Sequence, residues 1–117
     1  MSESAPEKLE SRVLALAAMH CRGGAPRLAA DELDVFLATL SGWSAVGNTL
    51  EKSFAFPNYH ATIAFVNALA WTAHREDHHP DLGVRYDRCV VTFSTHSAGG
   101  VTLNDVICAA KTERLFA

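Results

Sequence analysis

The sequence predicts an α+β fold in which a four-stranded antiparallel sheet carries three helices packed on one face, in the order α-β-β-α-β-β-α. Three observations support this prediction. The chain has 117 residues, of which 49% are hydrophobic, so it can fill one core and form a single domain over residues 1–117. Two pairs of strand-like runs are each joined by a short turn, as in antiparallel hairpins. Helical patterns precede, separate and follow these pairs, which places the helices together against the sheet.

Residues 1–28 are expected to be a peripheral N-terminal lead-in to a core over residues 29–114. Apolar residues in the lead-in would allow one short helix, which Gly23-Gly24 and Pro26 would end. His20-Cys21 beside the glycines is not followed by a second Cys/His pair at zinc spacing, so we do not expect a metal there.

The first helix of the core is predicted from Ala30 to Leu40. Four apolar residues recur on one face at i, i+3, i+4 and i+7, namely Leu33, Phe36, Leu37 and Leu40. The runs 43–46 and 49–56 then flank Gly47-Asn48. Because both residue types tolerate positive φ, this pair predicts a tight hairpin turn.

The longest helix is expected from residue 58 to residue 77. Pro57 suits a helix start and Asn58 is a good N-cap. The apolar residues cover more than one stripe, so we expect one face on the sheet and another on a second subunit. This pattern predicts a homodimer or homotetramer in which subunits partly bury one of three side chains: Phe65, Leu69 or Trp71.

The last two strands and the last helix follow. The run 84–86 is predicted to start the third strand, and 89–95 to form the fourth, with the turn at Asp87-Arg88. The final helix is expected to run to about Arg114. It would begin at Thr102, which resembles the first residue of a capping box completed by an Asp three residues later.

Composition excludes several classes of function. A formal net charge of −3 leaves no basic stripe for nucleic acid. The longest apolar stretch, 61–73, is too short to cross a bilayer. Acidic residues in the first ten positions have the wrong sign for a secretory leader, and three cysteines without CxxC spacing suggest reduced thiols. We therefore expect a cytoplasmic protein with no nucleic-acid or membrane partner.

The chemistry is expected around Asp77-His78-His79-Pro80. Four of the six histidines fall between His74 and His96. Pro80 cannot continue a helix, so the histidine pair lies at a helix C-terminus, where the carbonyl dipoles should raise a histidine pKa. A neutral imidazole both donates and accepts protons near pH 7, which suits acid–base work.

Three explanations can account for this histidine cluster. His74 and His78 have the i, i+4 spacing of zinc metalloproteases, but Arg75 stands where the H-E-x-x-H motif needs Glu. A histidine at a helix end is often only a cap, although several converging from two elements are harder to explain in that way. The third explanation is acid–base catalysis with no metal and no cofactor, in which neighbouring imidazoles share the protons.

The spacing favours the third explanation, because His74-x3-His78-His79-Pro80-x5-Tyr86-x9-His96-x8-Asp105 resembles the signature of the pterin-4a-carbinolamine dehydratase family. Further matches to the family lie at Gly42-Trp43, Phe54-x-Phe56, Tyr59, Phe65, Ser94-Thr95-His96 and Gly100-x-Thr102-x-x-Asp105. The resemblance covers roughly residues 28–114. It implies the fold described above and assembly into dimers or tetramers.

The resemblance implies a 4a-hydroxytetrahydrobiopterin dehydratase, which removes water from the pterin-4a-carbinolamine and so recycles the cofactor of aromatic amino acid hydroxylases. It implies that His78 and His96 are the acid/base pair and that His79 orients the pterin. The implied catalytic set is His78, His79 and His96. The implied pterin-binding set is Asp77, His78, His79, Pro80, Ser94, Thr95, His96, Ser97 and Trp43. Asp105 and His74 would support them from behind, with Asp105 fixing the tautomer of one imidazole.

The chain departs from the family pattern in three places. His74 stands where many members have Glu, Ser97 replaces a usual acidic residue, and Asn104 stands where an acidic residue is common. Some members bind a homeodomain transcription factor, and others are suggested to assist protein assembly. The alternative expectation is therefore a non-catalytic coactivator or assembly factor, which could lose its histidines without penalty.

Overall fold

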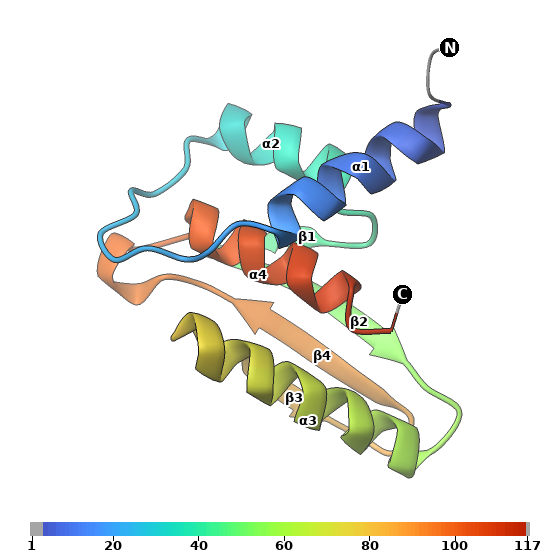
Figure 1. Cartoon of the computed structure of the whole chain (residues 1–117). Coiled ribbons are helices and arrows are strands. Elements are labelled where there is room, and N and C mark those ends of the chain that lie inside the picture. The colour runs from blue at the N-terminus through green and yellow to red at the C-terminus, as the bar shows by residue number, and fades with distance from the viewer. Residues whose placement is uncertain (1–3, 117) are drawn as a thin grey trace.

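The computed structural model describes residues 4–116, and a four-stranded sheet runs through its centre (Figure 1). The strands are β1 (Ser44–Val46), β2 (Thr49–Ala55), β3 (Asp81–Val84) and β4 (Arg88–Phe93). Their order across the sheet is β1-β2-β4-β3, and every neighbouring pair is antiparallel. The predicted antiparallel sheet is confirmed.

The hairpin between β1 and β2 turns where the sequence predicts. Gly47 takes a φ of +58°, a value that costs glycine little, and Ala45 lies opposite Leu50. Strand β2 then pairs with β4 over its whole length, from Leu50 opposite Phe93 to Ala55 opposite Arg88. The two central strands therefore come from different hairpins.

The third strand lies earlier in the chain than predicted. β3 covers Asp81–Val84, whereas the sequence placed its start at Val84 and its body beyond it. The physical reason is Pro80: the chain leaves the long helix in extended form after it, so pairing with β4 begins at Asp81 opposite Thr92. Residues 85–87 form the turn instead.

The described chain contains four helices rather than the three predicted. They are α1 (Ala5–Ala17), α2 (Ala30–Thr39), α3 (Tyr59–Glu76) and α4 (Leu103–Glu113). The additional helix is α1, which begins with a capping box between Ser4 and Glu7 and buries Leu16. Figure 1 shows α3 and α4 covering one face of the sheet, with α1 crossing α4 on its outer side.

Helix α3 buries a single stripe toward the sheet. Thr62, Phe65, Leu69 and Ala73 are buried, with Phe65 and Leu69 each only 1% exposed. The suggestion that these two side chains lie between subunits is therefore wrong, because they pack in the core of their own chain. Trp71, on the other side of the helix, is 63% exposed.

Helix α4 is buried more completely than any other helix, and its capping box matches the prediction. The Thr102 hydroxyl accepts a hydrogen bond from the Asn104 backbone N–H, and the Asp105 carboxylate accepts one from the Thr102 N–H. From Asn104 to Ala110 every residue is buried. Within residues 4–116 no helix is long and apolar enough to cross a membrane.

Candidate active site

The C-terminal end of α3 turns sharply into the site. Asp77 adopts the left-handed conformation with φ 49°, and its backbone N–H donates to the carbonyls of Ala73 and His74. The His78 N–H also donates to the Ala73 carbonyl, at 3.1 Å. This compact ending directs the chain, and with it the histidine pair, toward the N-terminus of α4.

The His78 imidazole is anchored on Asp105. Its Nε2 lies 2.6 Å from Asp105 Oδ1, and the ring lies nearly parallel to Phe93, with 6.1 Å between centroids. The Asp105 side chain is completely buried and that of His78 is 13% exposed. Since Nε2 donates to the carboxylate, Nδ1 is the nitrogen that remains for a ligand.

Asp105 is itself held in place through its second oxygen. Oδ2 accepts hydrogen bonds from the Thr95 hydroxyl and from the Thr102 N–H, both at 2.8 Å. The Thr95 hydroxyl therefore accepts in turn from the Thr102 hydroxyl, at 2.9 Å. One carboxylate thus caps α4, fixes the end of β4 and orients His78. The family resemblance implied a carboxylate behind an imidazole, and the capping box was expected separately; in the structure the same residue, Asp105, makes both sets of contacts.

This arrangement changes the proton affinity of His78. The hydrogen bond to Asp105 raises the pKa of the imidazole, burial opposes that rise, and the negative charge of Asp105 adds to it. His78 therefore keeps its proton to a higher pH than an ordinary histidine. An imidazole with this property is suited to donate a proton at neutral pH.

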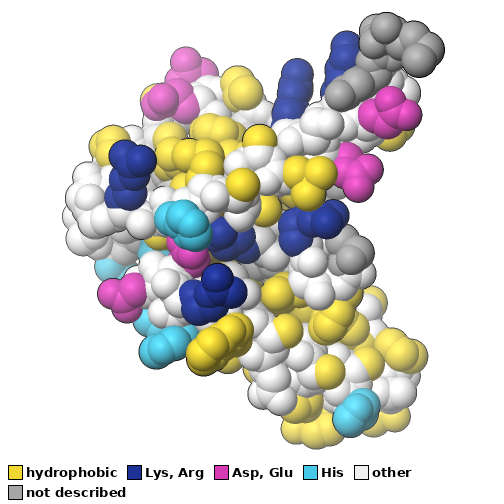
Figure 2. Space-filling model, viewed as in Figure 1, with side chains coloured by type: hydrophobic (Ala, Val, Ile, Leu, Met, Phe, Trp, Pro, Cys, Tyr) yellow, Lys and Arg dark blue, Asp and Glu magenta, His cyan; other side chains and the backbone are white. Residues whose placement is uncertain are grey.

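Most of the predicted site residues meet at one cavity of about 350 Å³. It is lined by Asp77, His78, His79, Ser94, Thr95, His96 and Ser97. Two elements supply them: the end of α3 and the segment after β4, which forms the short 3-10 helix η1 (His96–Ala98). Figure 2 shows histidine side chains gathered at this end of the molecule. The volume is in the range of small-molecule pockets.

A second cavity of about 370 Å³ adjoins the first, and its other wall consists of residues that were not predicted from the sequence. The two cavities share Asp77, His78, Thr95 and Ser97. The far wall is the loop 19–26, which we call the strap. Glu76 holds the strap by accepting hydrogen bonds from the Cys21 N–H at 2.8 Å and the His20 ring at 3.0 Å.

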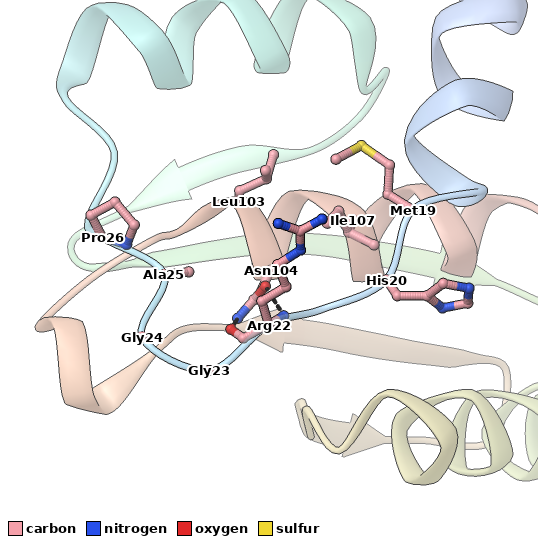
Figure 3. Close-up of a pocket in the computed structure, with 10 residues that line it drawn as sticks. All are labelled: Met19, His20, Arg22, Gly23, Gly24, Ala25, Pro26, Leu103, Asn104 and Ile107. Atoms are coloured by element: carbon pink, nitrogen blue, oxygen red, sulfur yellow. Dashed lines mark hydrogen bonds between the residues drawn. The ribbon is translucent and has the colours of Figure 1, made fainter.

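Asn104 fixes the next residue of the strap. Its side-chain oxygen accepts from the Arg22 N–H at 3.0 Å, and its amide donates to the Arg22 carbonyl at 2.7 Å (Figure 3). Only an amide side chain can make this pair, because a carboxylate has no N–H to donate. On the other side of the strap lies a further cavity, of about 610 Å³, whose lining includes Met19, Leu103 and Ile107.

Besides Asp105, three predicted site residues lie outside these two cavities. Trp43 is 5% exposed, donates its indole N–H to Glu113 and packs against Phe93, so it supports the ring beneath His78 and does not line the pocket. His74 stacks on the exposed Trp71. Pro80 is half-buried and lines neither of the two cavities.

Across residues 4–116, no group of three His, Cys, Asp or Glu side chains is placed to hold a metal ion. His74 and His78, which share zinc-like spacing, instead contact Trp71 and Asp105 respectively.

Known proteins resemble this chain closely. Residues 26–115 match the family model for pterin 4 alpha carbinolamine dehydratase. A relative from Chromobacterium violaceum is 60% identical over 93 residues, covering 80% of this chain and 86% of its own. One from Nitrosospira multiformis is 50% identical over 96 residues, covering 82% and 85%. Both are provisionally named pterin-4-alpha-carbinolamine dehydratases.

A solved structure has the same fold. It is a crystal structure described as a transcriptional coactivator/pterin dehydratase from Brucella melitensis, with a TM-score of 0.75 and 33% sequence identity. The match covers 78% of this chain and 99% of that one.

Proposed function

The chain belongs to the pterin-4a-carbinolamine dehydratase family, and we propose that it is an active 4a-hydroxytetrahydrobiopterin dehydratase. The observation that supports this best is the His78–Asp105 pair, an oriented imidazole of raised pKa beside a cavity that His96 also lines. Two acid–base groups supplied by separate elements can address different atoms of one bound molecule.

The reaction needs two proton movements and no redox step. One proton is added to the departing 4a hydroxyl, which leaves as water, and another is lost from N5, which gives the quinonoid dihydropterin. We assign the donor role to His78, because Asp105 keeps its imidazole protonated to higher pH. His96, exposed on η1, then accepts the N5 proton.

The remaining cavity residues have binding roles in this proposal. Pterins present ring N–H and carbonyl groups in one plane, which short polar side chains and imidazoles can pair. His79 would orient the ring, with Asp77, Ser94, Thr95 and Ser97 around it. Product release would return the cofactor to an aromatic amino acid hydroxylase, and we place the protein in the cytoplasm.

We also propose that the chain acts as a homodimer or homotetramer. Two exposed aromatic side chains of α3 support this, because Trp71 is 63% exposed and Tyr59 is 54% exposed, and aromatic residues are enriched in protein–protein interfaces. Sedimentation at micromolar concentration should give a mass above 12.6 kDa. A monomer at all concentrations would rule this assembly out.

The alternative is a non-catalytic coactivator or assembly protein. The observation that favours this alternative is the Brucella melitensis structure of the same fold, which is described as both a transcriptional coactivator and a pterin dehydratase. A protein with only that role would tolerate loss of both His78 and His96, whereas the dehydratase would not.

A turnover assay decides between the two. Synthetic 4a-hydroxytetrahydropterin is mixed with purified protein, and the appearance of quinonoid dihydropterin is followed above the spontaneous rate. We expect catalysis, undiminished after exhaustive chelation. A wild-type protein that leaves the spontaneous rate unchanged would refute the proposed function, and activity restored only by zinc would refute the metal-free mechanism.

A further inference from the structure

Two cysteines far apart in the sequence meet beneath the strap. Cys21 Sγ lies 3.5 Å from Cys108 Sγ, although 87 residues separate them. Cys21 belongs to the strap and is half-buried, whereas Cys108 lies in α4 and is 1% exposed. Neither residue belongs to the set of acid–base groups described above.

The surroundings hold this pair in register. The Cys21 N–H donates a hydrogen bond to the Glu76 carboxylate. The Asn104 side chain pairs with both the N–H and the carbonyl of Arg22, the next residue of the strap. The Cys21 thiol also lies 3.6 Å from the Asn104 backbone carbonyl. The strap runs along the N-terminal half of α4, as Figure 3 shows for its neighbours His20 and Arg22. The short Sγ–Sγ distance is therefore a product of several independent contacts.

The two thiols differ in access and in acidity. Cys21 lines the 370 Å³ cavity together with His78, so a small oxidant can reach it from solvent, and Cys108 lies behind it. The hydrogen bond from Cys108 lowers the pKa of the Cys21 thiol, burial opposes this, and the nearby His78 supports it, while Glu76 acts against it. The same hydrogen bond, with burial, raises the pKa of Cys108.

We propose that Cys21 and Cys108 form a hydroperoxide-sensitive modification site, in which Cys21 is the attacking thiol and Cys108 the resolving one. The Cys21 sulfur attacks one peroxide oxygen, so that an S–O bond forms, the O–O bond breaks and one water leaves. The Cys108 sulfur then attacks the Cys21 sulfur, which forms the S–S bond and releases the hydroxyl with the Cys108 proton as a second water. Two thiols are oxidised by two electrons, and the peroxide is reduced.

Oxidation would move the strap. A disulfide needs an S–S distance of about 2.05 Å, so the sulfurs must approach by about 1.5 Å. Cys108 is one helical turn from Asp105, and Cys21 is bound to Glu76, two residues before His78. The strap, which forms the far wall of the second cavity, would therefore shift relative to His78. This consequence rests on the proposed function, whereas the disulfide itself does not.

The first experiment maps the wild-type chain and needs no variant to fold. Folded protein is treated with a small excess of hydrogen peroxide, free thiols are alkylated, and the digest is analysed by mass spectrometry. We expect a peptide that joins Cys21 to Cys108 within one chain and is lost on treatment with dithiothreitol. Cys89, 0% exposed in β4, is the internal control and should remain a free thiol. If both Cys21 and Cys108 are recovered alkylated, or if Cys89 reacts as fast as Cys21, the proposed site is wrong.

Two variants separate the roles of the thiols. Cys108→Ala should leave the Cys21 sulfenic acid unresolved, so that dimedone labels Cys21 in that variant but not in the wild type. Cys21→Ser should remove both the cross-link and the label, and a label appearing on Cys108 in this variant would reverse the assigned order.

A third variant tests the effect on the cavity. In the Cys89→Ser background, cross-linked protein should show kcat/KM for the carbinolamine reduced about tenfold or more, since displacements near 1 Å in a site carry costs of this size, and dithiothreitol should restore it. Cross-linked protein with undiminished turnover would overturn only the coupling to the cavity. Reduced protein without turnover would instead overturn the proposed function.

Discussion

The two imidazoles that face the same cavity are held in opposite ways. His78 comes from the end of a long helix, is mostly buried and is fixed by a buried carboxylate. His96 lies on a three-residue 3-10 helix, is exposed and, within residues 4–116, has no hydrogen-bond partner for its ring. An anchored ring has its tautomer and orientation set before a ligand arrives, whereas an exposed one is set by the ligand. The difference predicts distinct responses to mutation.

The largest effect is expected when both rings are removed. In the double variant His78→Ala/His96→Ala the rate should approach that of the spontaneous reaction, because the other two titratable side chains that line the described cavity, Asp77 and His79, have binding roles in the proposal. Each single variant should lower kcat substantially, since one positioned acid or base contributes about 10²- to 10⁴-fold. Stopped-flow absorbance on the carbinolamine measures this, and near-normal kcat in the double variant would exclude the pair as catalyst.

The next effect concerns the anchor. Asp105→Asn preserves the shape, but the amide can satisfy the Thr95 and Thr102 donors only through its oxygen, which leaves an N–H facing His78 Nε2. The pKa of His78 should fall and its neutral tautomer should reverse, so we expect kcat to drop about 10²-fold. Two-dimensional NMR of the ¹⁵N-labelled imidazole reports both changes.

The control for this variant is Asp34→Asn, on the exposed surface of α2, which should leave activity unchanged. Suppose that in Asp105→Asn the pKa of His78 falls to that of an ordinary histidine and the activity remains complete. The hydrogen bond to Asp105 would then give His78 no catalytic advantage over His96, which lacks such a bond.

His79→Ala should separate substrate binding from catalysis, because it is expected to change mainly KM and to leave kcat nearly unchanged. His79 lines the cavity but is exposed and has no partner among the described residues. We expect KM to rise several-fold while kcat changes less than twofold, the pattern of lost uniform binding. A kcat that falls as far as in His78→Ala would instead make His79 a third acid–base group.

The anchored pair should also appear in the pH dependence of stability. Because folding raises the His78 pKa, the pair contributes fully below about pH 6.5, the ordinary histidine pKa, and its contribution is lost as pH rises through the folded value. The free energy of unfolding should therefore decline with rising pH above 6.5. Urea denaturation at a series of pH values measures this, and His78→Ala should flatten that part of the curve, whereas His96→Ala should not.

The smallest effect is expected at His74. Its ring stacks on the exposed Trp71, with 5.7 Å between centroids, and it lines neither cavity. His74→Ala should therefore change kcat and KM by less than twofold, comparable to the exposed control His60→Ala on the first turn of the same helix. A loss of tenfold or more would show that the family position it occupies still serves the reaction.

Local features of the fold were determined by the sequence alone. The turn at Gly47-Asn48, the Asn58 cap and the Thr102 capping box lie within three residues of their partners, so nearby residue types specify them. The spacing of the histidines along the chain likewise indicated which residues share a cavity. Helix α1 was foreseen only as an optional feature of the lead-in, because its marginal apolar pattern needs α4 beneath it to be stable.

The tertiary structure decided which of these residues contact one another. The family resemblance implied that Asp105 lies behind an imidazole, but only the fold shows that this imidazole is His78, 27 residues away. The contact between Cys21 and Cys108, 87 residues apart, is marked by no local pattern. The same packing moved Trp43 from the pocket into the core and brought the strap to the wall of the site. Hydrogen bonds within a turn depend on a few neighbouring side chains, whereas contacts between elements depend on how the whole core packs, which no short stretch of sequence specifies.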